Sequence, residues 1–297
     1  MNNIKDSFFI QDLEIYSGVK AHTIRIWEKR YDLLNPTRLN RNIRKYSLLD
    51  LQKLLNVSLL YSNGYKISKI SKLTEEELQE ECRSLSAETI QKNYFVNKLI
   101  VCMYGFDTLV FEEIYVELSA TMSFDKIFTD VYIPMLNHIG LLWQTDAIQP
   151  VHEHFISSLI TQKILLNTSL VSDIPNSDND EVFVLFLPEG EIHEIGLMFL
   201  NLVLKKQGLK TVYLGSSLPI DNIEFVINKF SKVSLICAFM IDKTPEEKTT
   251  FIETVKKLVV KPDHKIQIVG SIWDGYELDS SYKNSILFTN DFRDLKF

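Results

Sequence analysis

The chain has 297 residues, of which 45% are hydrophobic and 24% charged, and its net charge is −7. This length predicts two or three domains with their own cores. No stretch is apolar and long enough to cross a bilayer, and the first residues lack the pattern of a signal peptide, so we expect a cytoplasmic protein without membrane contact. Three widely spaced cysteines fit neither a disulfide framework nor a thiolate metal site and indicate reduced, buried thiols: Cys82, Cys102 and Cys237.

The acidic charge is unevenly distributed along the chain. Residues 20–45 contain eight basic residues and only two acidic ones, a local charge of +6. A concentrated basic segment is what phosphate binding needs, whereas an even net charge of −7 would argue against nucleic acid. This segment predicts contact with DNA.

Residues 1–75 predict short helices and one hairpin. A helical apolar pattern over 9–16 ends at Ser17-Gly18, and a second helix over 20–30 places Ile24 and Trp27 on one side. Residues 35–46, with a proline, several asparagines and four basic residues, predict a β-hairpin wing. Three further expectations follow in order: a helix over 48–61 capped by Ser47 and ended by Asn63-Gly64, a short helix near 68–73, and an acidic linker over 76–87.

Residues 88–175 predict a four-helix bundle. Apolar residues recur three or four positions apart, and turn formers are few. The pattern breaks only near 105–107, 121–123 and 146–150. Four helices joined by short loops are typical of a bundle.

Residues 178–297 predict a flavodoxin-like, doubly wound parallel sheet. Short and almost wholly apolar runs alternate with helical stretches, which is the pattern of strands buried on both faces. In such sheets, ligands bind beyond the carboxyl ends of the strands. The expected strands are 182–187, 211–215, 234–240, 265–270 and 285–290, and the expected helices are 191–206, 219–230, 245–258 and 275–283. The chain as a whole is therefore expected to combine α and α/β domains.

Three segments of the head resemble the MerR family of DNA-binding regulators. They are the recognition-helix pattern of residues 23–28 (TIRIWE), the step Leu34-Asn35-Pro36 and the wing end Arg44-Lys45-Tyr46. The wing departs slightly, since residues 41–43 stand where family members often have glycine; asparagine tolerates the same left-handed conformations. The resemblance implies a winged helix-turn-helix that binds double-stranded operator DNA.

The candidate DNA-binding residues fall into two groups. Side chains near the start of a helix in the major groove contact base edges, here Lys20, His22 and Thr23. The others are better placed to hold phosphates and fix the register: Arg25, Arg38, Arg41, Arg44 and Tyr46. Any one of them alone would be taken for a solvated surface residue, but together and in order they favour DNA binding.

A helix bundle followed by a flavodoxin-like sheet resembles the cobalamin-binding modules of methionine synthase and of CarH-like, light-responsive regulators. Two motifs carry the resemblance. Nine residues separate Trp143 from Glu153-His154, and the run Glu191–Gly196 (EIHEIG) comes after the first expected strand. The second motif is similar to D-x-H-x-x-G, with glutamate in place of aspartate.

The resemblance implies a role for each motif residue toward adenosylcobalamin or another cobalamin. His193 would bind cobalt from below, Glu191 would fix its tautomer, and Gly196 would let the helix pass close to the corrin tail. Ser216 and Leu218 fill the S-x-L position near the nucleotide tail. Gly270-Ser271 stands where a Gly-Gly pair is expected, so one glycine is lost.

The resemblance also implies a chamber above the cobalt. Trp143 would lie over the upper ligand, with Glu153 and His154 beside it. In the CarH-like scheme, light breaks the cobalt–carbon bond, and His154 would replace the lost ligand. The oligomer then dissociates and releases the DNA. A zinc site on His152 and His154 is discounted because residues two apart on a helix point to different faces.

Three interpretations of the whole chain follow. The favoured one is a non-enzymatic repressor whose cobalamin senses light. The second is a cobalamin-independent regulator that uses the same fold for protein contacts. Ser271, which replaces the second glycine of the expected Gly-Gly pair, is the feature that suggests it. The third is a corrinoid methyl carrier, against which the DNA-binding head argues. No long heptad run follows the head, so a homo-oligomer, a dimer or a tetramer, would form partly through the body, and a protein antagonist is a further candidate partner.

Overall fold

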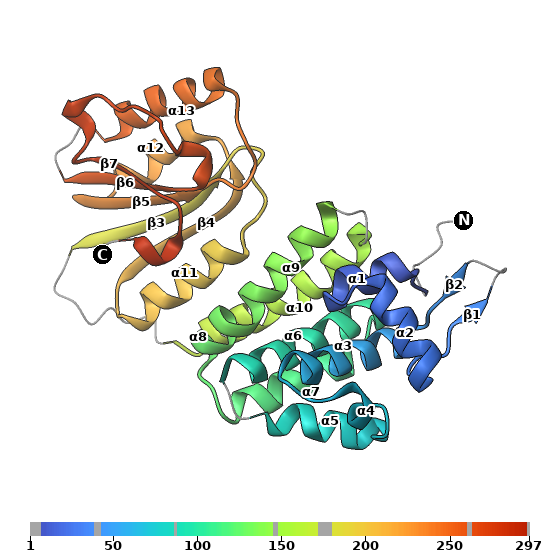
Figure 1. Ribbon diagram of the computed structural model, residues 1–297. Helices are drawn as coiled ribbons and strands as arrows, with labels where there is room; N and C mark the ends of the chain where they lie inside the picture. The colour runs from blue at the N-terminus through green and yellow to red at the C-terminus, as the bar shows by residue number, and fades with distance from the viewer. Residues whose placement is uncertain are drawn as a thin grey trace. The chain divides into compact units, whose positions relative to one another are not determined.

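The computed structural model describes residues 7–38, 43–85, 88–144, 148–171, 180–259 and 263–295 (Figure 1). Two compact units are present, Met1–Ile160 and Thr161–Phe297. Within these described ranges, no helix is both long and apolar enough to span a membrane. All three cysteines are buried free thiols, as expected.

The head has the expected helices and wing. Its elements are α1 (Ile10–Ser17), α2 (Ala21–Tyr31), the antiparallel strands β1 (Thr37–Arg38) and β2 (Arg44–Lys45), and α3 (Leu48–Ser62). Gly18 ends α1 in the left-handed conformation that glycine adopts without steric cost (φ 68°). Ser47 caps α3 and exchanges hydrogen bonds with Asp50. Ile24 and Trp27 are buried, which fixes the outer face of α2.

The expected linker over 76–87 is wrong, because most of it is helical. After the short helix α4 (Ile67–Ile70), α5 spans Glu75–Ser84. Thr74 caps α5 in a capping box with Glu77, and Leu78 and Cys82, four residues apart, are buried. Three of the acidic residues that suggested a linker, Glu75–Glu77, lie in the first turn, where negative charge interacts favourably with the helix dipole.

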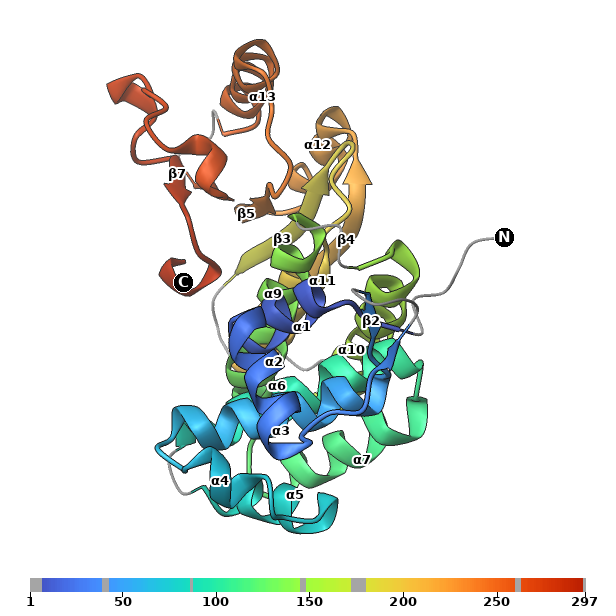
Figure 2. The same ribbon diagram turned by 45° about the vertical axis from the view of Figure 1, so that its right-hand side comes forward.

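Four helical stretches follow, with breaks where the sequence places them. They are α6 (Glu88–Gly105), α7 (Thr108–Ser119), a continuous stretch from α8 (Phe124–Ile127) through the π-helical turn η1 (Phe128–Tyr132) to α9 (Ile133–Gln144), and α10 (Pro150–Ser169). The head and these helices form one unit, since α3 runs alongside α6 and α5 packs on both (Figures 1 and 2). The head is therefore not set apart from the bundle, and the unit boundary falls within α10.

The second unit is a five-stranded parallel sheet of order β4-β3-β5-β6-β7. This is the flavodoxin-like order, as expected. Its strands are β3 (Glu181–Pro188), β4 (Lys210–Leu218), β5 (Lys232–Ala238), β6 (His264–Val269) and β7 (Ile286–Thr289).

Helices cover both faces of this sheet. One face carries α11 (Ile195–Lys206), and the other carries α12 (Ile223–Ile227) and α13 (Pro245–Leu258) (Figure 1). Two predicted helices are shorter than expected: 191–206 begins only at Ile195, and 219–230 is a 3₁₀ turn (η2, Ile220–Asn222) plus α12. The helix expected over 275–283 is only the 3₁₀ turn η4 (Ser280–Tyr282).

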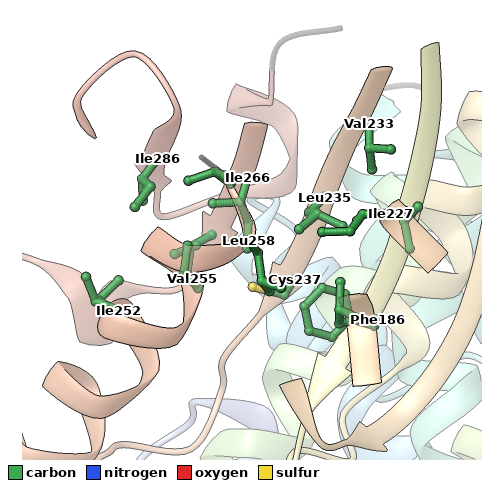
Figure 3. Close-up of a cluster of buried hydrophobic side chains, with 14 of the residues drawn as sticks. Phe186, Ile227, Val233, Leu235, Cys237, Ile252, Val255, Leu258, Ile266 and Ile286 are labelled. Carbon is green, nitrogen blue, oxygen red and sulfur yellow. The ribbon is translucent and has the colours of Figure 1, made fainter. Parts of the chain in front are cut away.

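Apolar side chains of the central strands fill the space beneath α12 and α13. Phe186, Leu235 and Cys237 project from neighbouring strands toward Ile227 and Val255 (Figure 3). All five side chains are buried. Burial on both faces explains why the central strands are almost wholly apolar runs. Strands β3 and β5 pair without a register shift from Glu181 and Lys232 to Phe186 and Cys237.

Candidate functional site

The exposed face of the head carries four of the eight predicted DNA-binding residues. His22 and Arg25 lie exposed on α2, and Arg38 lies exposed on β1 of the wing. Lys20, also exposed, forms an ion pair with Glu14 at 3.0 Å. Thr23 is half-buried, and its hydroxyl lies 3.3 Å from His22 Nε2. Arg41 lies outside the described residues.

Two predicted phosphate contacts anchor the wing instead. Tyr46 is completely buried, and its hydroxyl donates a hydrogen bond to Glu28 Oε2 at 3.0 Å. Arg44 is half-buried, and its Nε is 2.9 Å from Glu28 Oε1. A direct phosphate contact by Tyr46 was a wrong expectation, because the side chain packs beneath the wing. Arg44 is held by the same glutamate and joins the wing to α2.

This arrangement predicts different salt dependences for two variants. Arg38→Ala removes an exposed charge, so the slope of log affinity for operator DNA against log salt should fall by about 0.9. Tyr46→Phe should leave the slope unchanged and lower the free energy of unfolding by about 1 kcal/mol, since only the bond to Glu28 is lost. Titration of labelled operator DNA at several salt concentrations measures both. A reduced slope for Tyr46→Phe would contradict the burial.

The candidate cofactor site begins in the loop between β3 and α11. Strand β3 lies between β4 and β5, which is the position where the connections of a doubly wound sheet diverge. Residues 189–194 cross the carboxyl end of the sheet there. Glu191 lies within this loop and is completely buried, although it is a carboxylate. A buried charge needs several partners, and these define the site.

Five N–H groups surround the Glu191 carboxylate. Oε2 accepts hydrogen bonds from the backbone of Met240 (2.7 Å) and Ile241 (3.0 Å), just beyond β5. Oε1 accepts from the backbone of Ile192 (3.0 Å) and His193 (3.1 Å) and from the His193 ring (2.5 Å). Burial alone would raise the pKa of Glu191, but these donors lower it to about 2. The carboxylate is therefore ionised and ties the loop to β5.

The ionised carboxylate fixes the tautomer of His193. A carboxylate is only an acceptor, so His193 Nδ1 carries the proton and Nε2 keeps its lone pair while the ring is neutral. The side chain is 47% exposed, and Nδ1 is the ring nitrogen held by the buried Glu191. The expected hydrogen bond between His193 and Glu191 is present, and this donor set fits a metal-binding imidazole whose other nitrogen is held by a carboxylate; cobalt binding by His193 stays a prediction.

An apolar rim adjoins His193. Ile192, Met240 and Ile241 are exposed, although each is large and apolar. Their backbone N–H groups all bind the Glu191 carboxylate, so the three residues gather around one point. Exposed apolar side chains next to a candidate metal ligand suit a flat apolar ligand. Sequence reasoning missed Met240 and Ile241, and their only signal was their position at the end of a predicted strand.

The remaining predicted cofactor residues of the sheet domain have different surroundings. Ser216 is exposed and Leu218 half-buried at the end of β4. A side chain at Gly196 would meet the ring of Phe292 at 2.7 Å, so the close approach there is to Phe292. Gly270 has φ 144°, and a Cβ there would meet Phe239 O at 2.5 Å. Ser271 is exposed, so its side chain does not crowd the packed core.

The bundle residues lie in the first unit. Trp143 belongs to α9, and its side chain is outside the described part. In the first turn of α10, Glu153 is half-buried and His154 is exposed, whereas His152 is buried. The two histidines thus point to different faces, as expected. Among the described residues, no group of three or more His, Cys, Asp or Glu side chains is arranged to hold a metal ion.

His138 on α9 predicts a pH dependence of stability. Burial lowers the pKa of His138 below its ordinary value of 6.5. The unfolded chain then binds more protons than the folded one below pH 6.5, so stability is full above that pH and decreases as the pH falls. Denaturant unfolding at about pH 7.5 and about pH 5.5 should show this loss in the first unit, and His138→Leu should reduce it. Equal pH dependence in both proteins would contradict the assignment.

Comparisons with known families match the head and the helix bundle. Residues 9–77 match the family described as MerR HTH family regulatory protein, and residues 96–166 match the B12 binding domain. The HTH-type transcriptional repressor CarH of Myxococcus xanthus is 25% identical over 213 residues, 70% of this chain and 70% of that protein. The repressor CarA of the same organism is 23% identical over 248 residues, 82% and 80% of the two chains.

Among solved structures, the monomethylamine corrinoid protein of Methanosarcina barkeri matches 64% of this chain and 89% of its own, with 16% identity and a TM-score of 0.48. The winged head and the matched regions support a DNA-binding transcriptional regulator. More specifically, the MerR-type match, the B12 binding domain match and the two repressors together support a cobalamin-binding transcriptional regulator that resembles CarH.

Proposed function

We propose that this chain is a cytoplasmic transcriptional repressor that binds adenosylcobalamin and responds to light. The observation that carries the cofactor proposal is the pair formed by His193 and Glu191, in which an ionised buried carboxylate binds Nδ1 of a side chain that is 47% exposed. Repression is the activity named for the two Myxococcus relatives.

The residues of this chain have separate tasks in the proposal. His193 holds the cobalt, and Glu191 orients His193. Ile192, Met240 and Ile241 cover apolar surface of the cofactor. Gly270 allows the turn after β6 to pass close to the backbone of Phe239, where no side chain fits. When bound, the cobalamin supplies a light-sensitive cobalt–carbon bond. Trp143, Glu153 and His154 are proposed to face the other side of the cofactor, by resemblance.

The output of the proposed sensor is the oligomeric state. We expect a dimer or tetramer in the dark, with several heads bound to one operator, because linked sites raise the effective affinity. Dissociation after illumination would then weaken DNA binding without any change in the head itself. A protein antagonist that covers an oligomer interface would have the same effect.

The test is a purification with adenosylcobalamin in darkness. Retained colour after desalting, a changed spectrum after green light and a smaller particle in size-exclusion chromatography are the expected results. A colourless protein after desalting would contradict the cofactor proposal. Retained colour without a light response would instead favour sensing of cobalamin itself.

A cobalamin-independent regulator is the second candidate. The observation that favours it is the Phe292 ring, which already fills the space beside Gly196. Under this alternative, the purified protein stays colourless and its oligomeric state and operator affinity are unaffected by cobalamin and light. The same experiment therefore separates the two.

A further inference from the structure

An aromatic cluster that the proposed function does not use holds the first helix of the head on the bundle. Tyr16 of α1 and Tyr104 of α6 are both buried, and their hydroxyl groups are hydrogen-bonded to each other. Phe8, just before α1, meets the Tyr104 ring edge-on, with ring centres 5.1 Å apart. A hydroxyl that leaves water must find a partner inside the protein, so this pair favours one docked arrangement of the head.

The same cluster extends to the first turn of α10. The Tyr104 ring lies 4.9 Å from the ring of His152, which is buried. The Phe106 ring stacks on the other side of the cluster, 5.0 Å from His152. His152 is fixed in place because its Nδ1 accepts a hydrogen bond from Gln149 N at 3.2 Å. Any displacement of this turn therefore moves a ring that Tyr104 contacts.

The connection between α6 and α7 is strained at the same point. Phe106 has φ 50°, a left-handed conformation that bulky residues rarely adopt. Such a conformation persists where surrounding contacts impose it. The Phe106 ring is held by His152 and by Phe155, 5.4 Å away, and both belong to α10. Withdrawal of α10 removes these contacts and allows the turn that follows Tyr104 to relax.

On the other side of the cluster, α1 is joined to both DNA-binding elements. Glu14 of α1 accepts a hydrogen bond from Ala21 N, at the start of α2, at 2.9 Å. Phe8 and Tyr46 exchange two backbone hydrogen bonds of 2.8 Å, which tie the start of α1 to the wing. A change in the position of α1 is therefore carried to the recognition helix and to the wing together.

We propose that Tyr16, Tyr104 and His152 form a latch that couples the first turn of α10 to the orientation of the DNA-binding head. With the turn in place, the latch holds the head in one orientation. Displacement of the turn breaks the hydroxyl pair, and the head then samples several orientations and binds its operator more weakly. That this turn moves with the cofactor, through Glu153 and His154, rests on the proposed function; the coupling itself does not.

Hydrogen exchange of the full-length, cofactor-free protein tests the coupling from the head side. Tyr16→Phe keeps the ring and removes one hydroxyl. We expect amide exchange to rise about tenfold in residues 10–17, and also in residues 150–155 of α10, because coupling between two sites is reciprocal. Tyr104→Phe should give the same pattern. The double variant should add little, since each change breaks the same hydrogen bond.

Tyr132→Phe is the matched control. Tyr132 is a buried bundle tyrosine whose hydroxyl has no hydrogen-bond partner within the described ranges, so the loss of that hydroxyl should leave exchange in both segments unchanged. The latch is overturned if Tyr16→Phe raises exchange in residues 10–17 alone, or if the control gives the same effect. Cobalamin is absent from this measurement, so its failure is distinct from a failure to retain colour.

Discussion

Replacement of His193 by alanine is expected to abolish the imidazole-ligated spectrum of the cobalamin-loaded protein. In our proposal, His193 Nε2 is the protein's bond to the cobalt, and Glu191 can only orient it. We expect cobalamin affinity to fall by at least about 100-fold, because loss of a group that merely orients a ligand already costs about 10- to 100-fold. Equilibrium dialysis and the visible spectrum in darkness measure the two effects.

The interpretation of this variant is simple because the ring is half exposed. Its removal leaves no buried cavity but takes one of the five donors from the buried Glu191 carboxylate, so the free energy of unfolding should fall by about 1.5–3 kcal/mol. Added imidazole should restore the ligated spectrum if the alanine leaves a site of the right size. Operator affinity of the cofactor-free protein should equal that of the wild type. An unchanged spectrum in His193→Ala would exclude His193 as the cobalt ligand.

The fold could be predicted from the sequence where local patterns decide it. Ser47 with Asp50 defines the start of α3, and Gly18 defines the end of α1, because caps and turns depend on residues a few positions apart. The strands were predictable for a different reason. A strand buried on both faces is a short, continuous apolar run, as residues 182–187 are. Such a run lacks the spacing of three or four residues that marks an amphipathic helix.

Errors arose where few apolar residues carry the packing. Helix α5 was taken for a linker because its exposed face is acidic, yet Leu78 and Cys82 suffice to dock it. Tyr46 was assigned to phosphate because it follows Arg44 and Lys45. Its partners, Glu28 and Phe8, are distant in sequence, so nothing local signals that the ring is buried.

The candidate site was predictable in part. The motif containing Glu191 and His193 is local, and its tautomer chemistry follows from two residues. The donors at Met240 and Ile241 are 49 and 50 residues away from Glu191, and only the order of the strands brings them to it. The Phe292 contact with Gly196 likewise depends on how the segment after β7 folds back onto α11.

Glu191→Gln is expected to weaken both the fold of the second unit and its hold on cobalt. An amide has one acceptor oxygen where the carboxylate has two, so at least two of the five N–H groups lose their acceptor and face an NH₂ group. Each buried donor left unpaired costs about 1–3 kcal/mol, so two of them predict a loss of about 2–6 kcal/mol in the free energy of unfolding. Denaturant titration measures it. Glu189→Gln, which changes an exposed carboxylate in the same loop, should have no effect.

The effect on cobalt depends on which way the amide turns, and both orientations are unfavourable. With the amide oxygen on the His193 side, the N–H groups of Met240 and Ile241 lose their acceptor, and the loop separates from β5. With the NH₂ group on that side, Nδ1 becomes the acceptor and the proton moves to Nε2, the atom proposed to bind cobalt. We therefore expect cobalamin affinity to fall by about 10- to 100-fold. A variant that loses stability but keeps full affinity would show that Glu191 supports the loop without orienting the ligand.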